Sequence, residues 1–295
     1  MDQKDWQILN AIAEEKSLTK AAEKLFITQP ALSYRLKQLE ESFQTKLFFR
    51  TKKGVEFTSE GELLVDYSKE RIKEYLTLKD EIFNIGNEVR GTLRIGVSSN
   101  FAQYKLPALL KKFSTSYPNI QFKVQTGWST EIMNSLNQSQ IHLGILRGDY
   151  DWEGEKSLLT KEQLYIISKN EISLDELPQL PFIYYKTDNS LKQLISKWWN
   201  DQFSQSPLTA MEVDRQETSK EMVKNDLGFS VVPEICLTPS DDLYKEGLTY
   251  KNGQPVLRDT WLMYRTDFIQ LTIVKAFIDF LIKQQTVKNI KIFYR

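Results

Sequence analysis

The sequence is short of the side chains that most often carry covalent or metal chemistry. Its 295 residues contain one cysteine, Cys236, and one histidine, His142. A single cysteine excludes an internal disulfide and fits a reducing compartment. One histidine with one cysteine also excludes the usual zinc clusters and Cys–His dyads. Both residues stand in apolar runs, so we expect both to be packed in a core.

Motifs of catalysis are missing as well. The chain has no glycine-rich phosphate loop and no G-x-S-x-G nucleophile elbow. Together with the scarcity of cysteine and histidine, this argues against an enzyme. We therefore expect no catalytic residue, no metal site and no cofactor beyond a small-molecule ligand.

Long apolar runs and a net charge are also absent. No stretch approaches the ~20 apolar residues of a membrane span, and the N-terminal M-D-Q-K-D-W lacks the apolar run of a signal peptide. The 39 basic residues balance 39 acidic ones, and the pI is about 6.7. With 41% hydrophobic and 26% charged residues, the composition is that of a soluble globular protein. We expect a cytoplasmic protein with no membrane partner.

One stretch departs from this neutral background. Between Lys24 and Lys53 the chain has seven basic residues and two acidic ones, a local excess that marks a phosphate-binding surface. Within it, Thr28 is placed to cap a helix, and leucines recur at the period of one helix face. This pattern predicts two short helices followed by a basic two-stranded wing. Packed helices that never touch DNA remain the alternative, because a leucine stripe alone shows only packing.

The expected outer face of the second helix and the wing supply the candidate DNA contacts. A short helix with a buried leucine stripe and a polar, basic outer face suits a major groove, while basic turns contact phosphates. The candidates are Gln29, Pro30, Ser33, Tyr34, Arg35 and Lys37 on the helix, and Arg50, Lys52 and Lys53 in the wing.

A long helix is expected next, over residues 59–90. An apolar seam repeats in it at intervals of three and four, which is the heptad period of a coiled coil. A single helix with such a seam needs a partner, and we favour a second subunit because paired helix-turn-helix units read two-fold symmetric operators. The seam residues are Tyr75, Leu78, Ile82, Ile85 and Val89.

The N-terminal motif resembles a known family. Residues 21–40 read A-A-x-x-L-x-x-T-Q-P-A-L-S-x-x-L-x-x-L-E, followed by L-F-x-R at 47–50 and T-x-x-G at 58–61. This dense match is similar to the winged helix-turn-helix of LysR-type transcriptional regulators, and length and layout extend the resemblance over essentially the whole chain. The resemblance implies binding to double-stranded promoter DNA, assembly as a homodimer or homotetramer through the linker helix, and RNA polymerase as a further partner.

The remainder alternates strands and helices, the pattern of a doubly wound α/β sheet. Two lobes are expected, the first over about 91–161 and 265–295, the second over about 162–264. The fold class is therefore an N-terminal all-α winged helix-turn-helix (1–58), a linker helix (59–90), and an α/β two-lobed domain (91–295). In LysR-type regulators this last part is an effector-binding domain similar to periplasmic binding proteins. A solute-binding protein is the distant alternative.

Ligands in such folds lie at the carboxyl ends of strands. That rule selects hydroxyl, amide and arginine side chains: Ser98, Ser99, Asn100, Thr126, Ser129, Thr130, Arg147 and Arg258, with Thr218 and Ser219 at the start of a helix in the second lobe. Hydroxyls and arginines together suit a carboxylate. The alternatives are ordinary helix caps for the hydroxyls, an ion pair of Arg147 with Asp149 or Asp151, and one of Arg258 with Asp259.

Short runs resemble one branch of the family more closely. They are R-G-D from Arg147, K-E-M from Lys220, V-V-P-E from Val231 and L-R-D-T-W-L-M-Y from Leu257. These look like the branch that includes catabolite control protein E, which senses citrate and controls central-carbon genes. The resemblance implies that Arg147, Arg258 and Ser98 bind citrate. Another small anion or metabolite stays open.

Overall fold

The computed structural model describes residues 1–51, 54–85 and 88–292, without the side chains of residues 50, 84 and 285–292. The chain divides into two compact units, residues 1–85 and 86–295. Each unit has its own hydrophobic core, and each is described here by itself.

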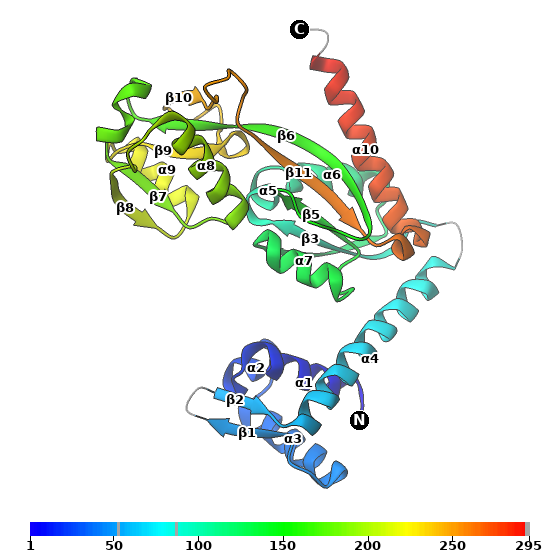
Figure 1. The fold of residues 1–295 in the computed structure, drawn as a ribbon. Helices are drawn as coiled ribbons and strands as arrows, with labels where there is room; N and C mark the ends of the chain where they lie inside the picture. The colour runs from blue at the N-terminus through cyan, green and yellow to red at the C-terminus, as the bar shows by residue number, and fades with distance from the viewer. Residues whose placement is uncertain (52–53, 86–87, 293–295) are drawn as a thin grey trace. The chain divides into compact units, whose positions relative to one another are not determined.

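The N-terminal unit is a small helical core with a two-stranded wing (Figure 1). Its elements are α1 (Gln3–Glu15), α2 (Leu18–Lys24), α3 (Gln29–Phe43), β1 (Phe48–Thr51), β2 (Gly54–Phe57) and α4 (Ser59–Asn84). The antiparallel β1 and β2 pair Phe48 with Phe57 at one end and Thr51 with Gly54 at the other. Leucines of α3 pack against α1 and α2, which is the arrangement that the leucine spacing predicts.

Side-chain caps fix where these helices begin. Ser17 accepts a hydrogen bond from the backbone N–H of Lys20, and Thr28 accepts one from that of Ala31, as expected for that threonine. Thr58 likewise caps α4. Each cap satisfies an N–H that the helix itself leaves unpaired, so the local sequence sets the element boundaries.

The linker helix is shorter than the heptad pattern predicts. α4 ends at Asn84, and the sequence has a glycine, which is costly inside a helix, two residues later at position 86. Val89 lies beyond it and packs against the first core of the second unit. Val89 therefore does not continue the apolar stripe of the helix, which is a correction to the predicted seam.

The second unit contains two sheets and six helices within the part of the chain that is described. The strands are β3 (Gly91–Ser98), β4 (Ile120–Gly127), β5 (Leu143–Arg147), β6 (Glu155–Ser168), β7 (Phe182–Tyr185), β8 (Thr209–Val213), β9 (Ser230–Pro233), β10 (Tyr244–Gly247) and β11 (Leu257–Tyr264). The helices are α5 (Ser99–Tyr104), α6 (Leu106–Ser116), α7 (Ser129–Asn137), α8 (Asn189–Gln202), α9 (Gln216–Lys224) and α10 (Thr272–Ile292).

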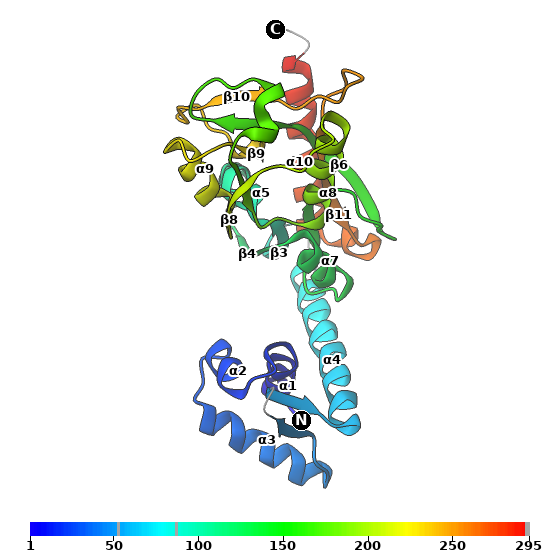
Figure 2. The same ribbon diagram turned by 60° about the vertical axis from the view of Figure 1, so that its left-hand side comes forward.

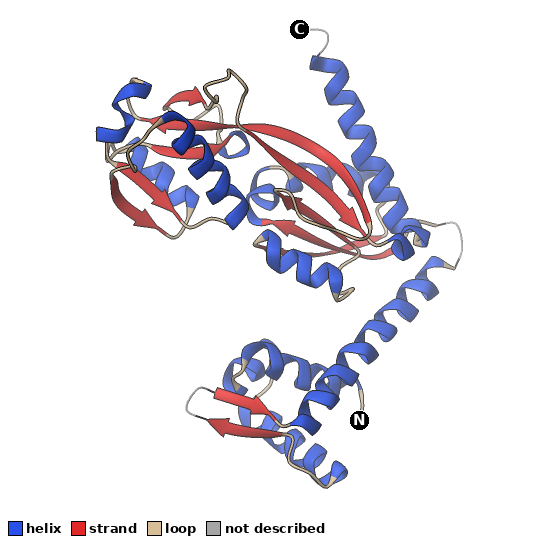
Figure 3. Ribbon diagram, in the orientation of Figure 1, coloured by secondary structure: helices blue, strands red, loops and turns tan. Residues whose placement is uncertain are grey.

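Two long strands connect two lobes. The large sheet has the order β10-β6-β11-β5-β3-β4, with β9 also on β6, and β7 pairs with β8 in a small sheet. Strands β6 and β11 run antiparallel, side by side, from one lobe to the other (Figures 1 and 3). The second half of β11 pairs with β5, and Leu262 and Tyr264 pack in the first core. Residues 260–264 thus pair with a strand of the first lobe, whereas the sequence placed 162–264 in the second.

Helices cover both faces of the first lobe's sheet (Figure 2). Ile95 on β3 and Ile145 on β5 face a core shared with α6 and α10, whereas Leu146 faces a smaller core under α7. Alternate residues of one strand point to opposite faces, so both faces are buried. This packing holds the ends of β3, β4 and β5 in fixed positions, where the pocket described below lies.

Candidate functional sites

The outer face of α3 is exposed and polar. Leu32, Leu36 and Leu39 are buried beneath it, while Tyr34 is exposed and the Lys37 side chain is 74% accessible. Two side-chain hydrogen bonds order this face, each between residues four positions apart. Gln29 Nε2 donates to Ser33 Oγ over 2.9 Å, and Gln38 Nε2 donates to Tyr34 Oη over 3.1 Å. The predicted contact residues of the helix therefore share one surface.

Arg35 is placed differently from its neighbours. Its guanidinium donates to Asp5 Oδ1 over 2.6 Å and to Asp2 Oδ2 over 2.5 Å. The hydrogen bond and charge of Asp5, with those of Asp2, raise the pKa of Arg35. The side chain thus holds α3 against the start of α1. Lys52, Lys53 and the side chain of Arg50, which were also predicted to contact DNA, lie outside the described residues.

An apolar stripe on α4 is left exposed by the described residues of the N-terminal unit. Tyr75, Leu78 and Ile82 are exposed on the helix, and Ile85 is exposed just after its end. Leu63 and Tyr67 are exposed earlier on the helix. Large exposed apolar side chains of this kind are available for contact with another molecule.

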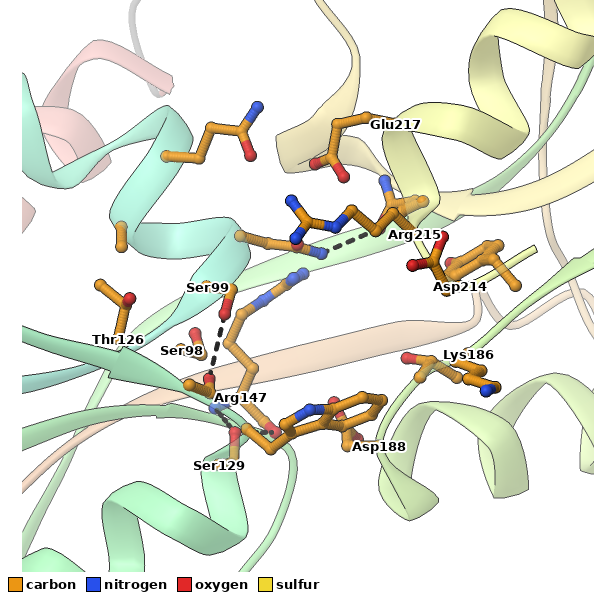
Figure 4. Close-up of a pocket in the computed structure, with 18 of the residues that line it drawn as sticks. Ser98, Ser99, Thr126, Ser129, Arg147, Lys186, Asp188, Asp214, Arg215 and Glu217 are labelled. Atoms are coloured by element: carbon orange, nitrogen blue, oxygen red, sulfur yellow. Dashed lines mark hydrogen bonds between the residues drawn. The ribbon is translucent and has the colours of Figure 1, made fainter. Parts of the chain in front are cut away.

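A pocket of about 650 Å³ lies between the two lobes of the second unit. Seven predicted effector residues line it: Ser98, Ser99, Asn100, Thr126, Ser129, Arg147 and Arg258. Figure 4 shows the serines and Thr126 along one wall, opposite Lys186, Asp214, Arg215 and Glu217. Thr130, which was also predicted, is exposed and is not a lining residue.

The first-lobe wall is built from the ends of three parallel strands. β3 ends at Ser98, β4 at Gly127 and β5 at Arg147. Ser129 fixes the end of β5, because its Oγ accepts from the backbone N–H of Arg147 over 3.2 Å and donates to the carbonyl of Arg147 over 3.3 Å. Ser129 is therefore a positioning residue for the arginine.

The two arginines are buried and have carboxylate partners. Arg147 is 1% exposed and pairs with Glu162, and Arg258 is 3% exposed and donates to Asp188 Oδ2 over 2.5 Å. The nearby acids that the sequence suggested are engaged elsewhere, Asp149 with Lys156 and Asp259 with Lys161. The alternative that each arginine forms an ion pair was thus right, but the acidic partners it named were wrong.

Buried donors without a protein partner remain in this pocket. Ser98 Oγ, and Nε and Nη1 of Arg147, are fully buried and make no hydrogen bond to any described residue. Burial, reinforced by the Arg258 cation, lowers the pKa of the Arg147 guanidinium to about 9. Unsatisfied buried donors cost about 1–3 kcal/mol each. Because these atoms have almost no accessible surface, a partner from outside the protein reaches them only if neighbouring side chains of the pocket move.

The second-lobe wall was missed by sequence reasoning. Lys186 and Asp188 follow β7, Asp214 and Arg215 follow β8, and Glu217 lies in the first turn of α9. The signal was present, because the same strand-end rule that selected the first wall applies to β7 and β8. Thr218 is not a lining residue, and Ser219 is buried, donating to Ser230 Oγ.

Two hydrogen bonds connect the walls across the pocket. Asn100 Nδ2 donates to Gln216 Oε1 over 2.8 Å, and Tyr104 Oη donates to Glu217 Oε1 over 3.4 Å. Both join α5 of the first lobe to the start of α9 in the second. The two lobes are thus linked by two side-chain hydrogen bonds.

The single cysteine and histidine are core residues, as expected. Cys236 is fully buried in the first core, and burial raises the pKa of its thiol to about 11. His142 is buried, and its Nδ1 accepts a hydrogen bond from the backbone N–H of Arg94. No helix among the described residues is long and apolar enough to cross a membrane, and no cluster of three potential metal ligands occurs among them.

A helix-turn-helix unit followed by a two-lobed pocket defines a ligand-responsive DNA-binding regulator. Residues 3–62 match the bacterial regulatory helix-turn-helix protein family, lysR type, and residues 86–286 match the LysR substrate binding domain. The chain belongs to the LysR family of transcriptional regulators, and is not an enzyme.

Relatives and solved structures agree with this assignment. The HTH-type transcriptional regulator YraN of Bacillus subtilis is 54% identical over 97% of this chain and 99% of that protein, and YkuM of the same organism is 35% identical over 94% and 96%. The fold is similar to full-length AphB of Vibrio cholerae (TM-score 0.67, 16% identity, 97% and 100% covered). It is also similar to full-length CbnR in complex with its target DNA (0.66, 18%, 96% and 99%).

Proposed function

We propose that this regulator binds a small carboxylate between its lobes and thereby adjusts its action on promoter DNA in the cytoplasm. The observation that carries the proposal is the set of buried donors with no protein partner in the pocket, Ser98 Oγ and two nitrogens of Arg147. Carboxylate oxygens match hydroxyl and guanidinium donors in geometry and charge. A polycarboxylate such as citrate is the first candidate, with control of central-carbon genes as its purpose.

The pocket suits a small, polar ligand. A volume of about 650 Å³ is within the usual range for small-molecule sites. Its lining contains hydroxyl, amide and charged groups from both lobes, so a bound ligand contacts both walls at once. Binding of that kind favours one arrangement of the lobes, which is how an effector shifts a conformational equilibrium. Another small anion satisfies the same donors and is the second candidate.

DNA recognition is assigned to α3 and the wing. Pro30, Ser33, Tyr34 and Lys37 are proposed to face the major groove, with Gln29 ordering Ser33 beside them. The wing residues Arg50, Lys52 and Lys53 are proposed to contact phosphate, from the sequence alone. For Arg35 we propose a supporting role, because its guanidinium is already bound to two aspartates of α1 and its cap.

The chain is proposed to assemble through α4. The exposed stripe of Tyr75, Leu78, Ile82 and Ile85 supports a dimer, which can pair further into a tetramer. Light scattering of the full chain at micromolar concentration tests this, since a monomeric mass would contradict it. RNA polymerase is a further proposed partner, on the resemblance to the family alone.

Thermal-shift measurements on the full chain test the effector. Citrate and a panel of other carboxylates are titrated, and a ligand that binds the folded state must raise the melting temperature with concentration. Arg147→Lys and Arg258→Lys should each weaken binding by about 1.5–3 kcal/mol, since an ammonium loses the bidentate geometry. Lys161→Ala, at an exposed cation outside the pocket, is the control.

The outcomes separate the candidates. Stabilisation by citrate that both arginine variants weaken supports the polycarboxylate. Stabilisation by a different anion, with the same response to the variants, keeps the site and replaces citrate. Binding that neither arginine variant alters would overturn the pocket assignment.

A further inference from the structure

Asp188 stands at the junction of the two lobes and uses each of its oxygens differently. Oδ1 accepts from the backbone N–H of Leu191 over 2.9 Å and so caps α8. Oδ2 accepts from Nη2 of Arg258 over 2.5 Å. The residue lines the pocket, and its side chain is 13% exposed. Asp188 therefore already provides Arg258 with a carboxylate oxygen in the pocket.

The buried charges of this region balance before any ligand enters. Arg147 is paired with Glu162, and Arg258 with Asp188, so two cations face two carboxylates. An anionic ligand would add negative charge to a neutral, poorly solvated cluster, which is strongly unfavourable. A ligand carboxylate that approaches Nη2 of Arg258 therefore competes with the protein carboxylate already bound there.

Glu162 is the less suitable of the two to leave. It is only 7% exposed, and its Oε2 accepts from the backbone N–H of Ile235 over 2.8 Å. It also lies within β6, opposite Arg258 of β11 in the strand pairing. Asp188, by contrast, lies in the connection between β7 and α8 and on the pocket surface. Its carboxylate can leave Arg258 without breaking a strand.

We propose that Asp188 is an internal competitor for the effector: it occupies Arg258 in the unliganded protein, and an effector carboxylate displaces it. The proposal rests on the proposed function, because it concerns a carboxylate ligand of the same pocket. In the unliganded state Asp188 holds the second lobe to β11 through Arg258, whose Nη2 also donates to the carbonyl of Arg147 over 3.3 Å. Displacement releases this link at the moment of binding, so effector affinity and lobe position are coupled.

Substitution of a competing residue should have the opposite effect on ligand affinity from substitution of an ordinary binding residue. Removing its charge should tighten binding of an anion, because Arg258 no longer has to exchange one carboxylate for another. Asp188→Asn and Asp188→Ser both keep a side chain that can cap α8. Asn has one acceptor oxygen, so it can cap α8 or accept from Arg258 but cannot do both, whereas Ser can cap α8 and is too short to reach Arg258. Both variants should bind citrate about tenfold more tightly or better, since a charge-assisted hydrogen bond exceeds the free energy of one factor of ten.

The matched control is Asp214→Asn. Asp214 lines the same pocket and has the same charge, but it makes no ion pair with either arginine. A general effect of negative charge in the pocket would appear in this variant as well, reduced because Asp214 is exposed to solvent. A competitive effect appears only at Asp188. Unliganded melting temperatures add a second measurement, since loss of the ion pair should lower that of both Asp188 variants and leave that of Asp214→Asn unchanged.

Calorimetry with citrate on the full chain decides the matter. Tighter binding by both Asp188 variants, with wild-type affinity in Asp214→Asn, supports the competitor. If the wild type binds citrate and the Asp188 variants bind it no more tightly, the competitor proposal is overturned. It is also overturned if Asp214→Asn tightens binding as much as the Asp188 variants do. Either result leaves the effector proposal intact. Binding by the Asp188 variants alone supports the competitor in its strongest form. Absence of binding by every variant overturns the competitor for citrate and, together with no response to the carboxylate panel, the effector proposal as well.

Discussion

The positive charges of the two units are held in opposite ways. On α3 the Lys37 ammonium is 74% exposed and has only a loose contact of 3.6 Å to Glu41, one helical turn away. In the pocket, Arg147 and Arg258 are 1% and 3% exposed, and each is paired with a carboxylate that is itself mostly buried. The α3 surface displays its charge to solvent, and the pocket encloses its own.

This difference teaches what each surface can recognise. Exposed cations attract any phosphate chain, and salt weakens that attraction. Buried cations are costly to leave unpaired. They therefore accept a ligand only when its shape and charge can replace the carboxylate partner that is displaced. On the proposed function, the exposed surface supplies affinity for DNA in general, and the enclosed one supplies selectivity for one small molecule.

The largest effect is expected from breaking the enclosed pair. Arg147→Ala leaves Glu162 buried without a cation, which should cost about 3–5 kcal/mol of the free energy of unfolding. Urea unfolding of the full chain, followed by circular dichroism, measures the loss. A loss under about 1 kcal/mol would show that Glu162 has found another partner or a proton.

The double variant Arg147→Met, Glu162→Gln tests whether the unpaired charge of Glu162 causes this loss of stability. With both charges gone, the unfolding free energy should return to within about 1.5 kcal/mol of the wild type, since the unpaired charge is the main cost. Effector binding should stay lost, because the guanidinium is absent. A double variant no more stable than Arg147→Ala would contradict the pairing of these residues.

The smallest effect is expected at the exposed surface. Lys37→Ala should change the free energy of unfolding by under about 0.5 kcal/mol, since its only contact is an exposed ion pair. It should nevertheless weaken binding to promoter DNA and make the affinity less dependent on salt, because a cation that faces the groove is lost. Fluorescence anisotropy with promoter and unrelated duplexes measures both. Unchanged affinity and slope would remove Lys37 from the interface.

A structural feature can be predicted from the sequence when the residues that determine it are close together along the chain. The cap at Thr28 and the buried leucines of α3 follow from neighbours within one or two turns, and the structure has both. Ser98 and Arg147 could be selected because strand ends are visible in the local pattern. Their chemistry is therefore predictable from short windows.

The partners of the arginines could not be predicted in that way. Glu162 meets Arg147 only because β6 lies beside β11 and β11 beside β5, and that pairing is not visible in a window of residues. Asp188 is 70 residues from Arg258 in the sequence. Nearby acids such as Asp149 were favoured because they are close in sequence, while tertiary packing decides the contact.

Salt dependence on the wild-type chain tests the central claim most directly. Affinity for promoter DNA and for citrate, or for the carboxylate that the thermal-shift panel selects, is measured between 50 and 200 mM potassium chloride. The account predicts that DNA affinity falls by about 10³-fold or more, as expected for several phosphate contacts, while effector affinity falls by less than about tenfold because its cations are enclosed. An effector affinity that falls as steeply as that for DNA would contradict the account.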